Sequence, residues 1–130
     1  LLNVIDQFNV RRDFFVKQED NKPAILPIEY EIVLCFKRIL SLCLSSEEIL
    51  ADIKIKTIDP QGNVLGEILT PLKFPQGVRN LRTRISMSGV LATTAGRYVY
   101  KIELKYPNMN EFAEIYQIPF EIETKSVAHV

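Results

Sequence analysis

Apolar and charged residues alternate along several stretches of the chain, most regularly between Gly96 and Tyr106. Over this stretch the even positions are apolar or aromatic, whereas the odd positions are mostly charged. Strict alternation of this length is typical of a β-strand that turns one face to a core and the other to water. We therefore expect a half-buried strand here, entered through a turn that ends at Gly96.

The same pattern predicts strands elsewhere in the chain. They are expected at Leu2–Phe8, Ile28–Ile39, Ala51–Ile58, Val64–Leu69, Asn80–Leu91 and Glu114–Glu123. The segment Asp59–Asn63 has proline and glycine at the positions that a tight turn requires. No long amphipathic helix separates any two strands, so parallel βαβ units are not expected.

Two further segments carry local signals. The apolar runs 14–16 and 24–26 flank a polar turn, which favours a hairpin, with an exposed apolar segment at 14–16 as the alternative. Ser45 followed three residues later by Glu48 forms a capping box, and Leu44 can pack on Ile49. This second signal predicts one or two helical turns.

Together these elements predict an antiparallel β-sandwich of about seven or eight strands with Greek-key links. One short helical turn is expected near Ser45–Ile49. Residues 1–124 are expected to form a single domain and residues 125–130 a C-terminal tail. The length of 130 residues and the hydrophobic content of 47% fit one globular domain with its own core.

The sixteen basic and sixteen acidic residues cancel, so no net field draws the chain to nucleic acid or to an anionic membrane. No apolar run is long enough for a transmembrane helix. The two cysteines, Cys35 and Cys43, could form a disulfide only across a short loop, and unpaired thiols fit a reducing compartment. We expect a cytoplasmic protein, with secretion left open because the sequence begins at Leu1.

Residues for catalysis or metal binding are scarce. His129 is the only histidine and lies in the predicted tail, where nothing positions it beside a nucleophile. No spacing of a metal site occurs, and the five glycines form no phosphate-binding loop. Glu29 and Glu31 share a strand face, as an acid–base pair could, but alternating charges are usual on a solvated face. We expect no enzymatic activity and no cofactor.

Basic residues provide the main alternative function. Arg79, Arg82 and Arg84 lie close together in the sequence, and a neighbouring strand with Lys54 and Lys56 would complete a positive stripe. Such a stripe could bind an anion or a nucleic acid, but binders of this kind usually interleave it with exposed aromatic rings. The available tyrosines instead fall on the parity of the expected core: Tyr98, Tyr100, Tyr106 and Tyr116.

Apolar residues outside the expected core predict a contact surface. The candidates for a partner interface are Phe14, Phe15, Val33, Cys35 and Leu42. Exposed apolar patches usually mark an interface, and open sheet edges can accept a strand from a partner. The preferred function is therefore a non-catalytic protein-binding or assembly module, whose partner is another protein or a second copy of the chain. The same residues could also be core positions or a homodimer seam.

Tyr98 is predicted to have a structural role. It lies two residues after Gly96, at the start of its strand. The tyrosine corner of Greek-key sandwiches has this placement, and its hydroxyl bonds to nearby backbone. We expect Tyr98 to help specify the fold.

Four stretches resemble an uncharacterised bacterial family of small single-domain proteins. They are LLNVIDQFN, IKTIDPQGNVLGE, TAGRYVYKIEL and IPFEIE. The family carries an LNIIGAFD-like strand, a DPDGK-like turn and a PGxYxF strand followed by an IPLxV-like strand. The resemblance implies an immunoglobulin-like sandwich and brings no assigned activity with it. The connection from Ile39 to Ile49 is longer than the family pattern.

Overall fold

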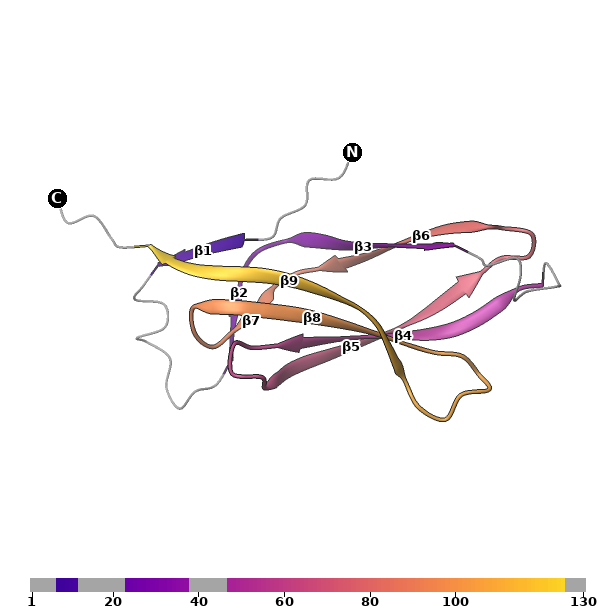
Figure 1. Cartoon of the computed structure of the whole chain (residues 1–130). Coiled ribbons are helices and arrows are strands. Elements are labelled where there is room, and N and C mark those ends of the chain that lie inside the picture. Colours follow the sequence, from indigo (N-terminus) through magenta and orange to yellow (C-terminus); the bar gives the residue numbers. More distant parts are fainter. Residues whose placement is uncertain (1–6, 12–22, 38–46, 126–130) are drawn as a thin grey trace.

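The computed structural model describes residues 7–11, 23–37 and 47–125, and this part of the chain is all-β (Figure 1). The strands are β1 (Gln7–Arg11), β2 (Ala24–Leu26), β3 (Tyr30–Lys37), β4 (Ile49–Ile58), β5 (Val64–Phe74), β6 (Asn80–Met87), β7 (Val90–Ala92), β8 (Gly96–Lys105) and β9 (Ala113–Lys125). The predicted all-β class is confirmed.

The strands form one large sheet and two separate strand pairs. The large sheet has the order β1-β9-β8-β4-β5, while β3 pairs with β6 and β2 pairs with β7. These pairings are antiparallel, except that β1 runs parallel to β9. Figure 1 shows β3 and β6 as a layer of their own that faces the large sheet. Most strand pairs are therefore antiparallel, because a short turn can join two antiparallel strands whereas parallel strands need a long crossover connection.

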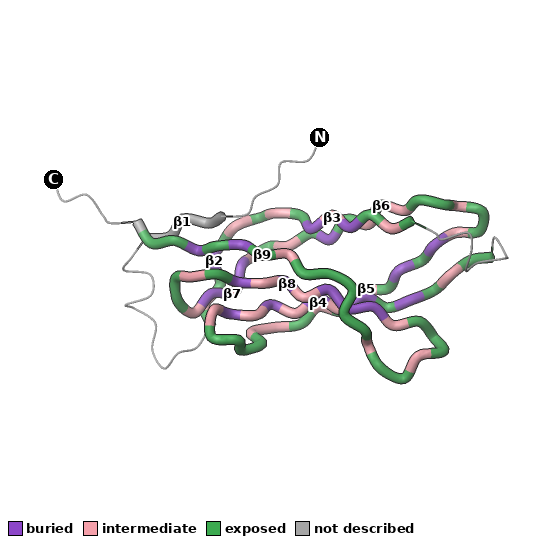
Figure 2. The backbone as a smooth tube through the Cα atoms, in the orientation of Figure 1, coloured by how far each residue is buried: buried purple, intermediate pink, exposed green. Residues whose placement is uncertain are grey.

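The hydrophobic core lies between these layers. Ile53 and Ile55 from β4 and Tyr98 from β8 pack in one cluster with Ile32 from β3 and Ile85 from β6. Buried positions recur at every second residue along β4 and most of β8, which Figure 2 shows as alternating purple segments; near the end of β8, Glu103 is buried as well. The period-two pattern of the sequence thus assigns these faces correctly.

The helical turn predicted near Ser45–Ile49 is not seen. Glu47 and Glu48 are not helical, and β4 already begins at Ile49, while residues 45 and 46 lie outside the described part of the chain. Ile49 pairs with Phe74 and so extends the β4–β5 ladder. A capping signal of one turn stabilises a helix only weakly, and long-range strand pairing outweighs it.

The predicted strand Asn80–Leu91 is two strands, because the chain changes partners within it. β6 pairs with β3, whereas β7 pairs with β2. Gly89 lies at the change, where a Cβ atom would collide with the side chain of Ile25. The predicted partner of the 24–26 run was the segment 14–16, which lies outside the described residues; the observed partner is β7.

β5 is longer than the predicted Val64–Leu69, since it continues through Pro71 to Phe74. Proline has no N–H to donate to a ladder and is therefore confined to edge strands. β5 is such a strand, because it is the last one in the order of the large sheet. The tail predicted from residue 125 begins one residue later at the earliest, because β9 includes Lys125.

Candidate functional site

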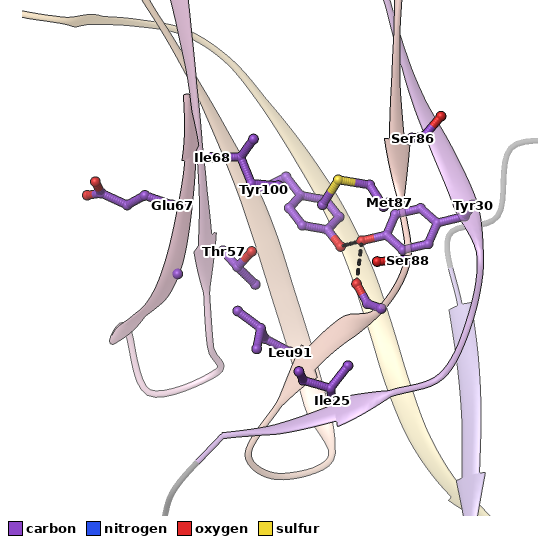
Figure 3. Close-up of a pocket in the computed structure, with 12 residues that line it drawn as sticks. Ile25, Tyr30, Thr57, Glu67, Ile68, Ser86, Met87, Ser88, Leu91 and Tyr100 are labelled. Atoms are coloured by element: carbon purple, nitrogen blue, oxygen red, sulfur yellow. Dashed lines mark hydrogen bonds between the residues drawn. The ribbon is translucent and has the colours of Figure 1, made fainter. Parts of the chain in front are cut away.

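A cavity of about 280 Å³ lies between the large sheet and the strands β6 and β7, close to β5 (Figure 3). Its walls are largely apolar. Ile68 comes from β5, Met87 from β6, Leu91 from β7 and Ile25 from β2. Buried residues such as Thr57 and Tyr100 line its inner part and exposed residues such as Ile25 line its mouth, so the cavity opens to solvent beside this edge of the large sheet.

Two tyrosine hydroxyls meet at the cavity. Figure 3 shows the rings of Tyr30 from β3 and Tyr100 from β8 pointing towards one another from the two layers. Their hydroxyls are hydrogen-bonded to each other, and the Tyr30 hydroxyl also lies 3.4 Å from the carbonyl oxygen of Gly89. The pair therefore joins β3, β8 and the break between β6 and β7 at one point.

Burial keeps both hydroxyls protonated. Desolvation raises the pKa of Tyr100 far above the ordinary tyrosine value, and its interactions with Tyr30 act in the same direction. Desolvation also raises the pKa of Tyr30, opposed by the hydrogen bond with Tyr100. A neutral hydroxyl can donate one hydrogen bond and accept others, so the pair presents polar but uncharged groups.

Thr57 from β4 is the third polar residue of interest in this wall. Its residue exposure is 6%, and Figure 3 shows its hydroxyl directed into the cavity. No hydrogen bond joins this hydroxyl to another described residue, in contrast to the bonded hydroxyls of Tyr30 and Tyr100. Buried polar groups are hydrogen-bonded in the great majority of cases, so the Thr57 hydroxyl is an exception among the described residues.

The strand beside the cavity has a free edge. β5 pairs with β4 along its length, and no described strand pairs with its other side. Leu69 is 62% exposed and Val64 is 52% exposed. An edge strand with unpaired backbone groups and exposed apolar side chains is a template for another strand.

The predicted role of Tyr98 has a clear structural counterpart. Its hydroxyl accepts hydrogen bonds from the amides of Thr93 at 2.9 Å and Thr94 at 3.0 Å, and it donates to the carbonyl of Thr94. Tyr98 is 0% exposed, so these bonds are made in the core. The hydroxyl thus bonds to nearby backbone as the sequence predicts for a tyrosine corner.

The interface residues predicted from the sequence are only partly described. Val33 and Cys35 lie on the outward face of β3, opposite Arg84 and Arg82 of β6. Cys35 is an exposed free thiol. The other predicted interface residues, Phe14, Phe15 and Leu42, lie outside the described part, as does the second cysteine at position 43. On this face the two apolar side chains are thus mixed with arginines and form no continuous apolar patch.

The basic residues do not assemble into the stripe that the alternative function required. Arg82 and Arg84 are on β6, whereas Lys54 and Lys56 are on β4 in the other layer. The Lys56 ammonium lies 3.2 Å from the Glu103 carboxylate, and Lys54 lies over the ring of Phe112. Arg79 is exposed in the turn before β6.

Two tyrosines predicted on the core parity are exposed instead. Tyr116 lies opposite Ile102 on β9 but is 64% exposed, and Tyr106 lies after the end of β8 and is 41% exposed. Parity places a residue on a face of the sheet, but burial also needs a second layer over that part of the face. For Tyr98 and Tyr100 this layer is present; both are buried.

No protein-family model, curated protein sequence or solved structure matches the chain. Among the described residues, no group of three or more histidine, cysteine or carboxylate side chains could hold a metal ion. The same part of the chain contains no helix of the length and apolarity that crossing a membrane demands. The site must therefore be interpreted from its own geometry.

Sequence reasoning missed the cavity and its polar groups. Tyr100 is buried, as its place on the predicted core face implies, and Tyr30 approaches it from the opposite layer. Nothing in their spacing, 70 residues apart, indicates that their hydroxyls meet. For Thr57 a signal exists: it is a polar residue on the parity of Ile53 and Ile55, at a position where the pattern calls for an apolar side chain.

Proposed function

We propose that this domain is a non-catalytic protein-binding module that accepts an extended segment of a partner along the free edge of β5. The observation that carries the proposal is the position of β5 at the end of the large sheet, with its second side unpaired among the described strands. Strand addition at such an edge gives affinity through main-chain hydrogen bonds and specificity through neighbouring side-chain pockets.

The direction of the backbone groups on β5 supports strand addition. In an antiparallel ladder, successive residues direct their backbone groups alternately towards the partner strand and away from it. Pro71 has no N–H, yet it lies within the continuous register opposite Asp52. We infer that Pro71 and the residues of the same parity, Glu67 and Leu69, direct their backbone groups to the free edge.

The proposal includes an immunoglobulin-like topology. The neighbouring strands β9, β8 and β4 of the large sheet are in the order expected of strands G, F and C in such sandwiches. The pairing of β3 with β6 is likewise that expected of strands B and E. The tyrosine corner at the start of β8 fits the same assignment. Many binding modules use sandwiches of this kind, but the fold alone does not assign the function. The free edge of β5 is the basis of the proposed function.

The test compares Leu69→Pro with Leu69→Thr. Proline at position 69 removes one N–H from the free edge and leaves the β4 ladder intact, whereas threonine removes the apolar side chain and keeps the N–H. A displayed library of random peptides is selected on the wild-type domain, and the recovered peptides are measured against both variants.

The proposal expects peptides with alternating apolar residues that bind wild type and Leu69→Thr and lose at least about tenfold in affinity for Leu69→Pro. Thermal melting establishes that both variants are folded. Peptides that bind all three proteins equally, or a selection that yields no binder, would refute strand addition at β5.

A further inference from the structure

The cavity beside β5 holds a buried hydroxyl that lacks a partner. Thr57 is 6% exposed, its hydroxyl points into the cavity in Figure 3, and no other described residue bonds to it. A buried donor and acceptor without a partner costs free energy, and such groups are rare in native structures unless water or a ligand satisfies them.

A second hydrogen-bond acceptor can come from Tyr100, which lines the same cavity and whose hydroxyl is bonded to that of Tyr30. If Tyr30 donates its proton to the carbonyl of Gly89, Tyr100 must donate to Tyr30. The Tyr100 oxygen then keeps a free lone pair, because a hydroxyl accepts as well as donates. A bound group with an O–H or N–H could donate to Tyr100 and also bond to Thr57.

The remaining walls select for an apolar body. Ile25, Ile68, Met87 and Leu91 line the space. Glu67 is the only charged residue among the described residues that line it, and its carboxylate points away from the space in Figure 3. The volume of about 280 Å³ exceeds that of engineered apolar cavities that bind benzene. Any ion would lose part of its hydration among the apolar walls.

We propose that this cavity is a binding site for a small neutral molecule with an aromatic or alicyclic body and one hydroxyl or N–H donor. The donor would lie between the hydroxyls of Thr57 and Tyr100, and the body would contact the apolar walls. This combination of an apolar pocket with a few converging polar groups is the usual form of a small-molecule site. The inference does not rest on strand addition at β5, because it uses the interior of the cavity and not the free edge.

The high pKa values of the two tyrosines agree with this assignment. Burial keeps Tyr30 and Tyr100 neutral, so neither offers an anion to a cationic ligand. The apolar walls and the uncharged hydroxyls therefore both favour a neutral ligand.

The experiment uses benzyl alcohol, toluene and benzoate as probes, titrated at millimolar concentrations and followed by amide chemical shifts. Benzyl alcohol has the proposed body and donor, toluene lacks the donor, and benzoate is charged. The protein variants are Thr57→Val, which has nearly the same shape without the hydroxyl, and Thr83→Val as a control. Thr83 is an inward threonine of β6 that does not line the cavity.

The proposal expects saturable binding of benzyl alcohol, with shifts that centre on Ile68, Met87 and Leu91. Toluene should bind about fivefold more weakly, and benzoate should not bind measurably. Thr57→Val should weaken benzyl alcohol by about fivefold and leave toluene unchanged, whereas Thr83→Val should leave both unchanged.

Three results would overturn the inference: no saturable binding of any probe, shifts that centre elsewhere, or equal loss of both probes in Thr57→Val. Leu69→Pro separates this site from the proposed function, since it should leave probe binding intact. If peptides bind at β5 but benzyl alcohol does not bind, the cavity site is refuted and strand addition is supported. The opposite result would refute strand addition alone.

Discussion

The hydroxyl of Thr93 donates a hydrogen bond of 3.2 Å to a carboxylate oxygen of Asp59, 34 residues earlier in the chain. The other oxygen of Asp59 accepts from the backbone amides of Gln61 at 3.0 Å and Asn63 at 2.8 Å. One carboxylate thus shapes the β4–β5 turn and ties it to the β7–β8 turn. Asp59 is 6% exposed, so this tie is made largely away from water.

Removal of that hydroxyl should destabilise the fold. Thr93→Val leaves Asp59 with one bond fewer, and we expect the free energy of unfolding to fall by about 1–2 kcal/mol. Thr57→Val is the matched comparison, because its hydroxyl has no partner among the described residues; here stability should be unchanged or rise by up to about 1 kcal/mol. Urea denaturation of both variants measures the difference. Equal losses at the two positions would contradict this account.

Tyr98→Phe should lower the free energy of unfolding by about 1–3 kcal/mol, because the amides of Thr93 and Thr94 lose a buried acceptor. Tyr116→Phe is the control, since Tyr116 is 64% exposed. Chemical denaturation with both variants gives the comparison. If the Tyr98→Phe midpoint matches wild type, the tyrosine corner does not help to hold the fold.

Gly96→Ala should cost more stability than Gly62→Ala. Both glycines have positive φ, 145° at Gly96 and 89° at Gly62, so both substitutions strain the backbone, by about 1 kcal/mol or more. Only at Gly96 would the new Cβ also meet a neighbour, the Cγ of Pro60 at 2.8 Å; at Gly62 nothing lies within 4 Å. Thermal melting of the two variants ranks them, and the reverse order would show that the approach to Pro60 is unimportant.

The tyrosine pair should make stability depend on alkaline pH. The unfolded chain releases tyrosine protons near pH 10, whereas burial raises the pKa of both Tyr30 and Tyr100 in the folded chain. Their contribution is therefore fully present below pH 10 and is lost as pH rises above it, by up to about 1.4 kcal/mol per pH unit for Tyr100 and by less for the partly exposed Tyr30.

Tyr100→Phe removes one of these groups and should flatten the alkaline decline. Denaturation curves of wild type and variant, measured between neutral pH and pH 11, give the two slopes. Parallel slopes above pH 10 would mean that the pair does not hold its protons through burial.

Period-two alternation accounts for most of what could be predicted from the sequence. It assigns the inward faces of β3, β4, β6 and β8, and the proline–glycine signal gives the turn at 59–63, where the Gly62 amide donates to the Asp59 carbonyl at 3.0 Å. Both signals are local and depend on a few neighbouring residues. They need no knowledge of which strand pairs with which.

The features that were missed depend on contacts between distant segments. The pairing of Ile49 with Phe74 replaces a predicted helical turn, and the change of partner at Gly89 divides one predicted strand into two. Tyr116 is 64% exposed although Ile102, which lies opposite it on β8, is buried, so its exposure does not follow from the alternation. The cavity has the same origin, because it requires Tyr30, Thr57 and Tyr100 from three strands to face one space.

The parallel pairing of β1 with β9 has a consequence for biosynthesis. Gln7 lies opposite Glu121, so the first described strand can join the large sheet only after the last strand has been made. At ordinary translation rates this interval lasts on the order of ten seconds. Throughout it the segment that becomes β1 has no site in the sheet, and once β8 has been made, its edge is bare until β9 follows. The nascent chain is therefore exposed to wrong pairing during synthesis, and a chaperone that covers extended segments at the ribosome would act on it at this stage.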